Sequence, residues 1–443
     1  MPAILSVMRS RVAGALRPLR LLALPAGAVA LAAQGAVRRA AGQDPDAVAR
    51  LLRERNVART RRVLGGLKGG ALKAGQLLST VEALFPADPE QTWRQALTDL
   101  QETNPPMPWR SARGVLAAEL GPDWTDRFAA FDPRPVAAAS LGQVHRAVWA
   151  DDGREVAVKV QYPGVREAVL ADVGALAAAS RAASAVARGI ALPPLVAELR
   201  TRLLEELDYE REAAHQRAFA AAYAGDPQAA VPGVVLATTR VLVQDWLGGT
   251  PLAAVATSGT QADRDRAGLV YQRFLLGGPA RCGLLHTDPH PGNFRLLADG
   301  RLGVLDFGSC LALPGGLPRT FGRLVTALLA GDDADVEAAL RQEGLVRPGA
   351  RIDVRKLRAY LAPFSEPARH ETFTYSRAWL KGRFGRVDDP RNPDFAVALQ
   401  LTIPPEQLFT HRVWLGIVGV LCQLGATVPV RPELRRLLPG FGL

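Results

Sequence analysis

Cysteine is scarce in this chain. The three cysteines, Cys282, Cys310 and Cys422, lie far apart in a sequence of 443 residues. An odd, dispersed set of cysteines fits neither a disulfide framework nor a zinc site, whose cysteine ligands come in closely spaced pairs. We therefore expect the protein to work in a reducing compartment.

Long apolar runs are also few. Residues 21–37 are apolar, but at about 1.5 Å per residue a helix of this length falls short of the roughly 30 Å core of a bilayer. For residues 1–40 the sequence favours a basic, apolar helix that packs on the protein or associates with a membrane surface. A signal peptide and a short membrane anchor are the alternatives. A second apolar run, 413–428, predicts a buried terminal helix.

Acidic residues are fewer than basic ones, 43 against 54, which gives a formal net charge of +11. Such a charge attracts nucleic acid or anionic lipid. Because no zinc finger, RNA-binding signature or dense basic run accompanies it, we expect no nucleic-acid partner and retain an anionic membrane surface as a candidate.

Lysine is rare, since only five of the 54 basic residues are lysines. Two of the five, Lys73 and Lys159, lie in motifs described below. The point charge of an ammonium group and the planar fork of a guanidinium group are not interchangeable. A lysine at these two positions therefore indicates a specific role.

The most informative stretch is 286–293, which reads His-Thr-Asp-Pro-His-Pro-Gly-Asn and is followed by Asp-Phe-Gly at 306–308. In kinases an aspartate orients the acceptor hydroxyl, an asparagine five positions later holds one Mg²⁺, and the aspartate of the Asp-Phe-Gly turn holds another. Asp288, Asn293 and Asp306 have that order and spacing. The sequence therefore predicts ATP and Mg²⁺ as cofactors, with Asp288 catalytic and Asn293 and Asp306 as metal ligands.

Residues 156–159, Val-Ala-Val-Lys, resemble the strand that places a kinase lysine on the nucleotide phosphates. Such a lysine is positioned by a glutamate on a helix that packs against the sheet. A charged helix is predicted over about 195–222, where Asp208 and Glu212 are four residues apart and would share a face. These residues are candidate partners of Lys159.

Hydrophobic patterning predicts an α+β chain with two lobes. The segment 131–135 marks the change from a helical pattern to strands, and strands are predicted near 144–149, 155–161, 234–237, 241–245, 294–297 and 302–305. After about residue 317 the pattern is mostly helical. We expect a bilobal protein-kinase-like fold with a helical N-terminal extension and a helical C-terminal tail. The expected boundaries are 1–40 for the basic helix, 41–108 for the extension, 109–247 for the N-lobe, and 248–443 for the C-lobe with its tail.

Together these motifs resemble the UbiB/AarF atypical kinase family. The matching segments are the alanine-rich stretch 137–140, Leu-Gly-Gln-Val-His at 141–145, the strand 156–161, Glu-x-Asp-Tyr-x-x-Glu at 206–212 and the loop 286–293. The resemblance runs from about residue 60 to residue 330. It implies an atypical kinase or ATPase that supports isoprenoid-lipid or quinone metabolism, and it makes Glu212 the partner of Lys159.

The family's Lys-x-Gly-Gln motif is present at 73–76. In relatives this extension folds over the active site, fills the cleft that a protein substrate would use, and brings its lysine to the equivalents of Glu206 and Asp306. The resemblance therefore implies a regulatory set, which is Lys73, Gln76, Glu206 and Asp208.

Nucleotide contacts are expected from three places in the sequence. Where a protein kinase has a glycine-rich loop this chain has alanines, which restrict positive φ and close approach of the backbone to phosphate. We therefore expect the nucleotide to sit differently and transfer to protein hydroxyls to be poor. The hinge beside adenine is expected directly after a hydrophobic strand. The expected nucleotide-binding residues are Ala137, Ala138, Ala139, Ser140, Lys159, Gln244, Asp245 and Trp246.

Three functions are compatible with these motifs. The first is an ATP- and Mg²⁺-dependent atypical kinase or ATPase, cytoplasmic and peripheral to the inner face of a membrane; 308–318 is too short for the activation segment of an ordinary protein kinase. The second is a small-molecule phosphotransferase of the aminoglycoside or choline kinase type, which lacks Lys-x-Gly-Gln. The third is a nucleotide-gated scaffold or lipid-extraction protein that binds lipid-biosynthesis enzymes.

Overall fold

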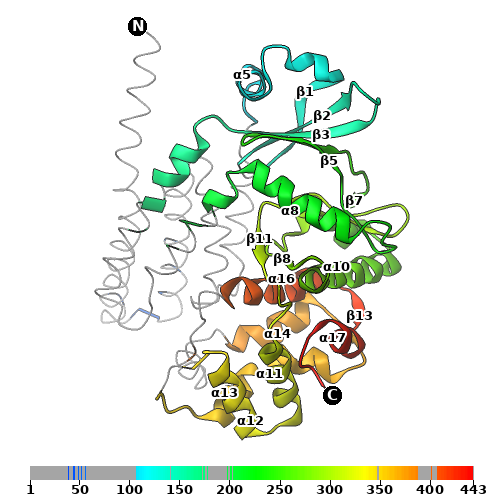
Figure 1. The fold of residues 1–443 in the computed structure, drawn as a ribbon. Coiled ribbons are helices and arrows are strands. Elements are labelled where there is room, and N and C mark those ends of the chain that lie inside the picture. The colour runs from blue at the N-terminus through cyan, green and yellow to red at the C-terminus, as the bar shows by residue number, and fades with distance from the viewer. Residues whose placement is uncertain are drawn as a thin grey trace.

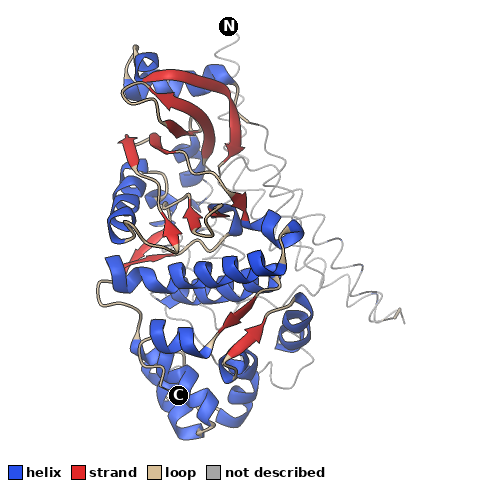
Figure 2. Cartoon of the chain, turned by 90° about the vertical axis from the view of Figure 1, so that its right-hand side faces the viewer, coloured by secondary structure: helices blue, strands red, loops and turns tan. Residues whose placement is uncertain are grey.

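The computed structural model describes residues 106–346 and 349–387, with gaps at 140 and across much of 172–202, and also residues 401 and 407–442. Before residue 106 it describes only isolated positions between 38 and 55. All of the predicted basic helix 1–40 except Arg38, together with Lys73, Gln76 and Ser140, therefore lies outside the described residues. Within them the chain has the predicted α+β, two-lobed architecture, with a strand-rich lobe above a mostly helical one (Figures 1 and 2).

One lobe is built on a five-stranded antiparallel sheet. Its order is β1-β2-β3-β6-β5, with bounds Phe128–Ala138 for β1, Gly142–Trp149 for β2, Glu155–Gln161 for β3, Val234–Ala237 for β5 and Val241–Asp245 for β6. Side chains alternate along a strand, so the valines of β3 pack with helix α5 (Trp109–Leu120) in one cluster. This alternation leaves Lys159 on the opposite face. The predicted hairpin over 144–161 is confirmed.

Strand β1 was not expected, because the prolines at 133 and 135 argue against a strand. The structure nevertheless pairs Phe128–Ala138 with β2. Two features accommodate the prolines: β1 is the edge of the sheet, and its register shifts on both sides of Pro135. Edge positions and bulges are where a strand tolerates a residue without an N–H donor.

The predicted continuous helix over 195–222 is wrong. Helix α8 spans Tyr209–Ala222, and Asp208 is its N-cap, with extended backbone angles and a side chain that accepts hydrogen bonds from the amides of Glu210 and Arg211. Aspartate favours this position because its carboxylate satisfies amides that have no helical partner. Asp208 therefore does not share a helical face with Glu212, which lies in the first turn of α8.

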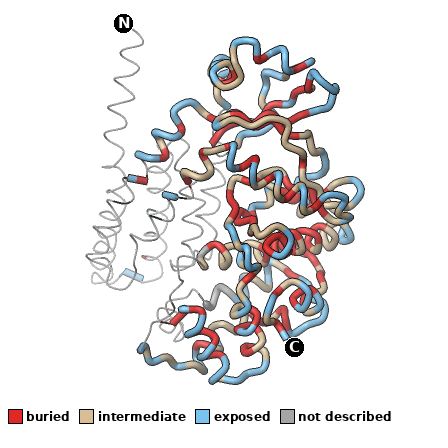
Figure 3. The backbone as a smooth tube through the Cα atoms, viewed as in Figure 1, coloured by how far each residue is buried: buried red, intermediate tan, exposed pale blue. Residues whose placement is uncertain are grey.

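The other lobe is built around helix α10 (Gln261–Cys282), and half of the residues of this helix are buried. Figure 3 shows that buried residues gather in the interior of this lobe. Helices α9 (Leu252–Ser258), α16 (Leu408–Leu424) and α17 (Arg431–Leu437) pack against α10. Helices α11 (Arg319–Ala330), α12 (Asp333–Gln342) and α13 (Val354–Ser365) pack on one another in a second hydrophobic cluster, and α14 (Arg377–Val387) contacts α13 and α16. The run 413–428, predicted as a buried terminal helix, is helical only to Leu424, where α16 ends; residues 427 and 428 belong to a strand, and α17 follows. Val413, Ile417 and Leu421 of α16 share one hydrophobic cluster with the buried side of α10. In the part of the chain that is described, no helix is both long and apolar enough to cross a membrane.

Short strands position the loops between the lobes. β8 (Leu284–His286) pairs with β11 (Cys310–Ala312), and β9 (Phe294–Leu296) pairs with β10 (Leu302–Val304). Residues 287–293 thus leave β8 beside the point where 306–309 enter β11. The remaining strands are β4 (Ala229–Ala230), β7 (Thr250–Pro251), β12 (Thr372–Thr374) and β13 (Thr427–Pro429). Because α11 begins at Arg319, soon after β11, the expected absence of room for an activation segment is confirmed.

The Leu-Gly-Gln-Val-His segment forms a buried polar chain. Met107 N donates to Gln143 Oε1 at 2.9 Å, and Gln143 Nε2 lies 2.9 Å from His145 Nε2. His145 Nδ1 lies 2.9 Å from the carbonyl oxygen of Asp132. Since that carbonyl can only accept, Nδ1 carries the hydrogen and Nε2 accepts from Gln143. A neutral His145 therefore connects β2 to β1 and to the segment that leads into α5.

We predict that acid weakens this lobe through His145. Burial lowers the pKa of His145 below its ordinary value, although the Asp132 carbonyl acts in the opposite direction. The unfolded chain, with a histidine pKa of about 6.5, therefore binds the proton first. The stabilisation is complete above about pH 6.5 and is lost as the pH falls toward the lower folded pKa. Urea unfolding between pH 8 and pH 5 measures this loss.

His145→Phe should give a shallower dependence of unfolding free energy on pH, because one titrating group is removed. The exposed His370 provides the control, and His370→Asn should keep the wild-type slope. An unchanged slope in His145→Phe would contradict the assignment.

Candidate active site

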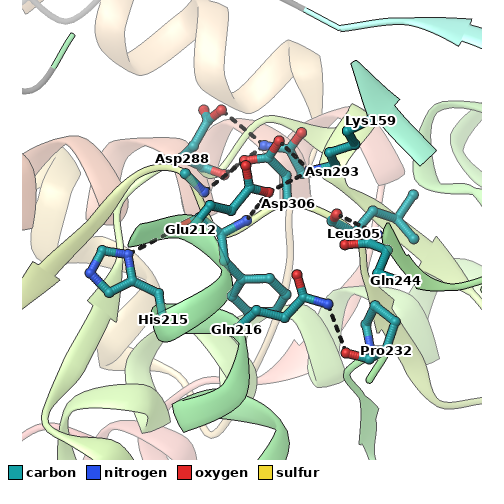
Figure 4. A network of polar contacts seen from close by, with 12 residues as sticks. Lys159, Glu212, His215, Gln216, Pro232, Gln244, Asp288, Asn293, Leu305 and Asp306 are labelled. Atoms are coloured by element: carbon teal, nitrogen blue, oxygen red, sulfur yellow. Dashed lines mark hydrogen bonds and ion pairs between the residues drawn. The ribbon is translucent and has the colours of Figure 1, made fainter. Parts of the chain in front are cut away.

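Lys159 lies at the centre of the site. From β3 its Nζ donates to Glu212 Oε1 at 2.5 Å and to Asp306 Oδ2 at 3.0 Å (Figure 4). The side chains of Lys159 and Glu212 are 7% and 3% exposed, whereas that of Asp306 is 36% exposed. The pairing of Lys159 with Glu212 expected from the sequence is confirmed, and Asp306 is the most exposed member of the group.

The group holds two carboxylates against one ammonium. Burial alone lowers the pKa of Lys159, but the charges of Asp306 and Glu212 outweigh burial and raise that pKa above its ordinary value. Burial raises the pKa of Glu212, and the charge of Asp306 adds to this, while Lys159 opposes it. Lys159 is therefore held in its charged form. Because two carboxylates face one ammonium, the excess negative charge favours binding of a further cation beside Asp306.

The Asp306–Gly308 turn is fixed by hydrogen bonds on several sides. Phe307 N donates to Glu212 Oε1 at 3.3 Å, and Gly308 N donates to Asp306 Oδ1 at 3.1 Å. His286 Nε2 lies 2.7 Å from the carbonyl oxygen of Asp306, so Nε2 carries the hydrogen. Burial lowers the pKa of His286, which keeps its ring neutral. Phe307 is fully buried, and the carboxylate of the preceding Asp306 binds Lys159.

Asp288 and Asn293 meet across their loop. Asn293 Nδ2 donates to Asp288 Oδ2 at 2.9 Å, and Tyr271 on α10 donates its hydroxyl hydrogen to the carbonyl oxygen of Pro289. This use of Nδ2 leaves the amide oxygen of Asn293 as the potential metal ligand. The structure thus brings together the five residues predicted as catalytic: Lys159, Glu212, Asp288, Asn293 and Asp306.

The donor set suits Mg²⁺. Asn293 and Asp306 offer amide and carboxylate oxygens, which hard cations prefer, and Mg²⁺ completes its coordination with phosphate oxygens and water rather than with an all-protein cage. Among the described residues, no group of three or more His, Cys, Asp or Glu is placed to hold a metal alone. The excess carboxylate of the Lys159 group supplies the negative charge.

The predicted nucleotide contacts divide into two groups. Gln244 lies opposite Ala157 on the Lys159 face of the sheet; its Nε2 donates to Leu305 O at 3.2 Å, and its buried Oε1 has no hydrogen-bond partner among the residues described. Asp245 instead pairs with Arg154, and Trp246 lies under Arg146. Of the three residues predicted for the hinge, Gln244 is therefore the one whose side chain lies on the Lys159 face of the sheet.

The alanines expected in a loop are partly in a strand. Ala137 and Ala138 end β1 and pair with Val144 and Gln143, while Ala139 N donates to Gly142 O at 2.8 Å in the turn to β2. Their backbone hydrogen bonds close the hairpin directly.

Two predicted regulatory residues have different surroundings. Asp208 caps α8 and is placed by the helix that it starts. Glu206 lies beside the Asp306–Gly308 turn, because a Cβ built on Gly308 would stand 3.9 Å from Glu206 Cγ. Glu206 is thus near the group that the Lys73 motif reaches in relatives, whereas Lys73 itself lies outside the described residues.

Sequence reasoning missed Arg412. This residue of α16 donates from Nη2 to Asp288 Oδ1 at 3.2 Å. A Cβ on Gly416, one turn further along α16, would lie 2.2 Å from Pro289 Cγ, so a glycine is needed for this contact. The sequence offered only a glycine four residues after an arginine, and that pattern does not indicate which residue the arginine binds.

We predict that loss of Glu212 is costly. Glu212→Ala leaves a buried ammonium with one partner instead of two, and breaking a buried ion pair typically lowers the free energy of unfolding by about 3–5 kcal/mol. Chemical denaturation measures the effect. Glu155→Ala is the control, because it removes the exposed bridge to Arg146 and should cost less than about 1 kcal/mol. Equal losses in the two variants would contradict a central role for the buried group.

The chain is similar in sequence to known proteins. The sequence model of the ABC1 atypical kinase-like domain matches residues 99–340. The chain is 33% identical over 409 residues to the mitochondrial atypical kinase COQ8 of Saccharomyces cerevisiae, covering 90% of this chain and 79% of that protein. It is 34% identical to the chloroplastic protein ACTIVITY OF BC1 COMPLEX KINASE 1 of Arabidopsis thaliana, spanning 37% of that longer protein.

The chain is also similar to a protein of known structure. The chain matches Rv3197 of Mycobacterium tuberculosis, solved in complex with erythromycin, with a TM-score of 0.69 and 38% identity over 90% of this chain and 99% of that one. The matched family segment contains Lys159, Glu212 and the 286–308 loops whose geometry is described above. The chain belongs to the ABC1 atypical kinase-like family, which includes the COQ8 relatives.

Proposed function

We propose that this protein is an ATP- and Mg²⁺-dependent atypical kinase or ATPase that acts in isoprenoid-lipid or quinone metabolism. The observation that supports it most directly is the buried Lys159 ammonium bound to both Glu212 and Asp306. The ion pair between Lys159 and Glu212 is one that a kinase requires before it can bind the nucleotide phosphates productively.

Each residue of the site has a part in this proposal. Lys159, held by Glu212, contacts the phosphates; Asn293 and Asp306 hold Mg²⁺; and Asp288 orients the attacking hydroxyl or water. When bound, Mg²⁺ neutralises the charge that develops on the phosphates. Gln244 has an unpartnered Oε1 that can accept a hydrogen bond from the amino group of adenine.

Several observations disfavour ordinary protein phosphorylation. Only six residues separate β11 from α11, at 313–318, so an activation segment does not fit. The Ala137–Ala139 stretch lacks the glycines that let a backbone wrap around phosphate. We propose that the extension 41–108, which carries Lys73 and Gln76, covers the site between the lobes 109–247 and 248–443, with Lys73 directed at Glu206 and Asp306.

The lipid part of the proposal rests on the family. UbiB/AarF members support isoprenoid-lipid and quinone metabolism, and the net charge of +11 favours an anionic membrane surface. We propose a peripheral location on such a surface, in contact with lipid-biosynthesis enzymes.

The second candidate function is that of a small-molecule phosphotransferase. The structure of Rv3197 with erythromycin favours it, because it shows a hydroxylated organic ligand bound to a relative.

The metal site can be tested by calorimetric titration of ADP with and without Mg²⁺. Wild-type protein should bind ADP more tightly with Mg²⁺. Asp306→Asn should abolish that difference, because it removes the charged ligand. Asp299→Asn, which changes an exposed aspartate of the β9–β10 turn, should behave as wild type. Unchanged affinity and metal dependence in Asp306→Asn would overturn the assignment.

A further inference from the structure

Asp288 binds a residue of its own loop and also a residue from a distant part of the chain. Asn293, within the same loop, binds Asp288 Oδ2, and Arg412 of α16 binds Asp288 Oδ1 at 3.2 Å. The side chains of Arg412 and Asp288 are only 15% and 10% exposed. A pair so shielded from water interacts more strongly than an ion pair on the surface.

The position of α16 is fixed by packing. Its buried Val413 and Ile417 belong to the core cluster around α10, and Gly416 meets Pro289, the residue after Asp288. Residues four apart lie one above the other on a helix. Contact at Gly416 therefore places Arg412 against the adjoining end of the same loop, where Asp288 stands.

Arg412 provides a cation that the loop lacks. The sequence 286–293 contains no lysine or arginine, and the ammonium of Lys159 is engaged by Glu212 and Asp306. A carboxylate oxygen can accept two hydrogen bonds. Asp288 Oδ1 can thus keep its bond to Arg412 while it accepts the hydrogen of an attacking hydroxyl or water.

We propose that Arg412 is a positioning residue for Asp288, and that α16, although outside the family-matched segment 99–340, completes the acceptor side of the active site. This inference rests on the proposed function, in which Asp288 orients the attacking group. Asn293 binds one oxygen of the Asp288 carboxylate and Arg412 binds the other, so the two bonds together fix the orientation of the carboxylate. An enzyme gains rate from such fixed geometry.

The test is steady-state hydrolysis of Mg·ATP by the full chain, together with titration of Mg·ADP. Arg412→Ala should lower kcat by about 10- to 100-fold, as expected for a misplaced catalytic group, while the Kd for Mg·ADP changes less than about twofold. Arg412→Lys should retain more activity. Arg301→Ala, which breaks an exposed Arg–Asp pair, is the matched control and should keep the wild-type kcat.

Two further measurements separate positioning from a structural role. Millimolar guanidinium chloride should partly restore kcat in Arg412→Ala, which an unfolded variant could not show. The double variant with Asp288→Asn should be no slower than Asp288→Asn alone, because Arg412 acts through Asp288.

Several outcomes overturn the inference. A wild-type kcat in Arg412→Ala, or losses that add in the double variant, would show that Arg412 does not act through Asp288. A higher kcat would show that Arg412 shields Asp288 instead. Wild-type protein that binds Mg·ADP but hydrolyses no ATP would refute the ATPase form of the proposed function, and the positioning role with it. Hydrolysis that is unaffected by Arg412→Ala would refute the inference alone.

Discussion

The structure depends on one buried charge, the ammonium of Lys159. Burying a charge costs several kcal/mol unless partners surround it, and here the partners come from separate parts of the chain: Glu212 from α8 and Asp306 from the turn between β10 and β11. The sheet, the helix and the lower lobe must therefore all be in place before the charge is satisfied. The same three elements form the site at which we propose that a nucleotide binds.

The hydrogen bonds around this group extend to both lobes. Glu212 also accepts the amide of Phe307, and His286 holds the Asp306 carbonyl, so the 286–293 loop and the 306–308 turn form one connected unit. The α16 helix adds Arg412 to that unit from beyond the family-matched segment. The C-terminal tail is thus part of the site and not merely a covering for α10.

The motifs were predictable because each has a fixed local spacing. Lys159, Asp288, Asn293 and Asp306 could be assigned from short sequence patterns, and the alternating valines of β3 gave the face of the sheet on which Lys159 lies. Features set by tertiary context could not be predicted. The edge strand β1 was not predicted because it contains prolines. The role of Asp208 as an N-cap was not predicted because the helical pattern of the sequence continues on both sides of it. Arg412 reaches Asp288 across 124 residues of sequence, with no motif to relate them.

The most direct test of this account is an experimental structure of the protein with Mg²⁺ and a non-hydrolysable ATP analogue. We expect Lys159 Nζ to contact phosphate oxygens while it keeps Glu212, and Mg²⁺ to be bound by Asn293 and Asp306, with Arg412 still on Asp288. A metal held by other residues, or a nucleotide bound away from Lys159, would contradict the account.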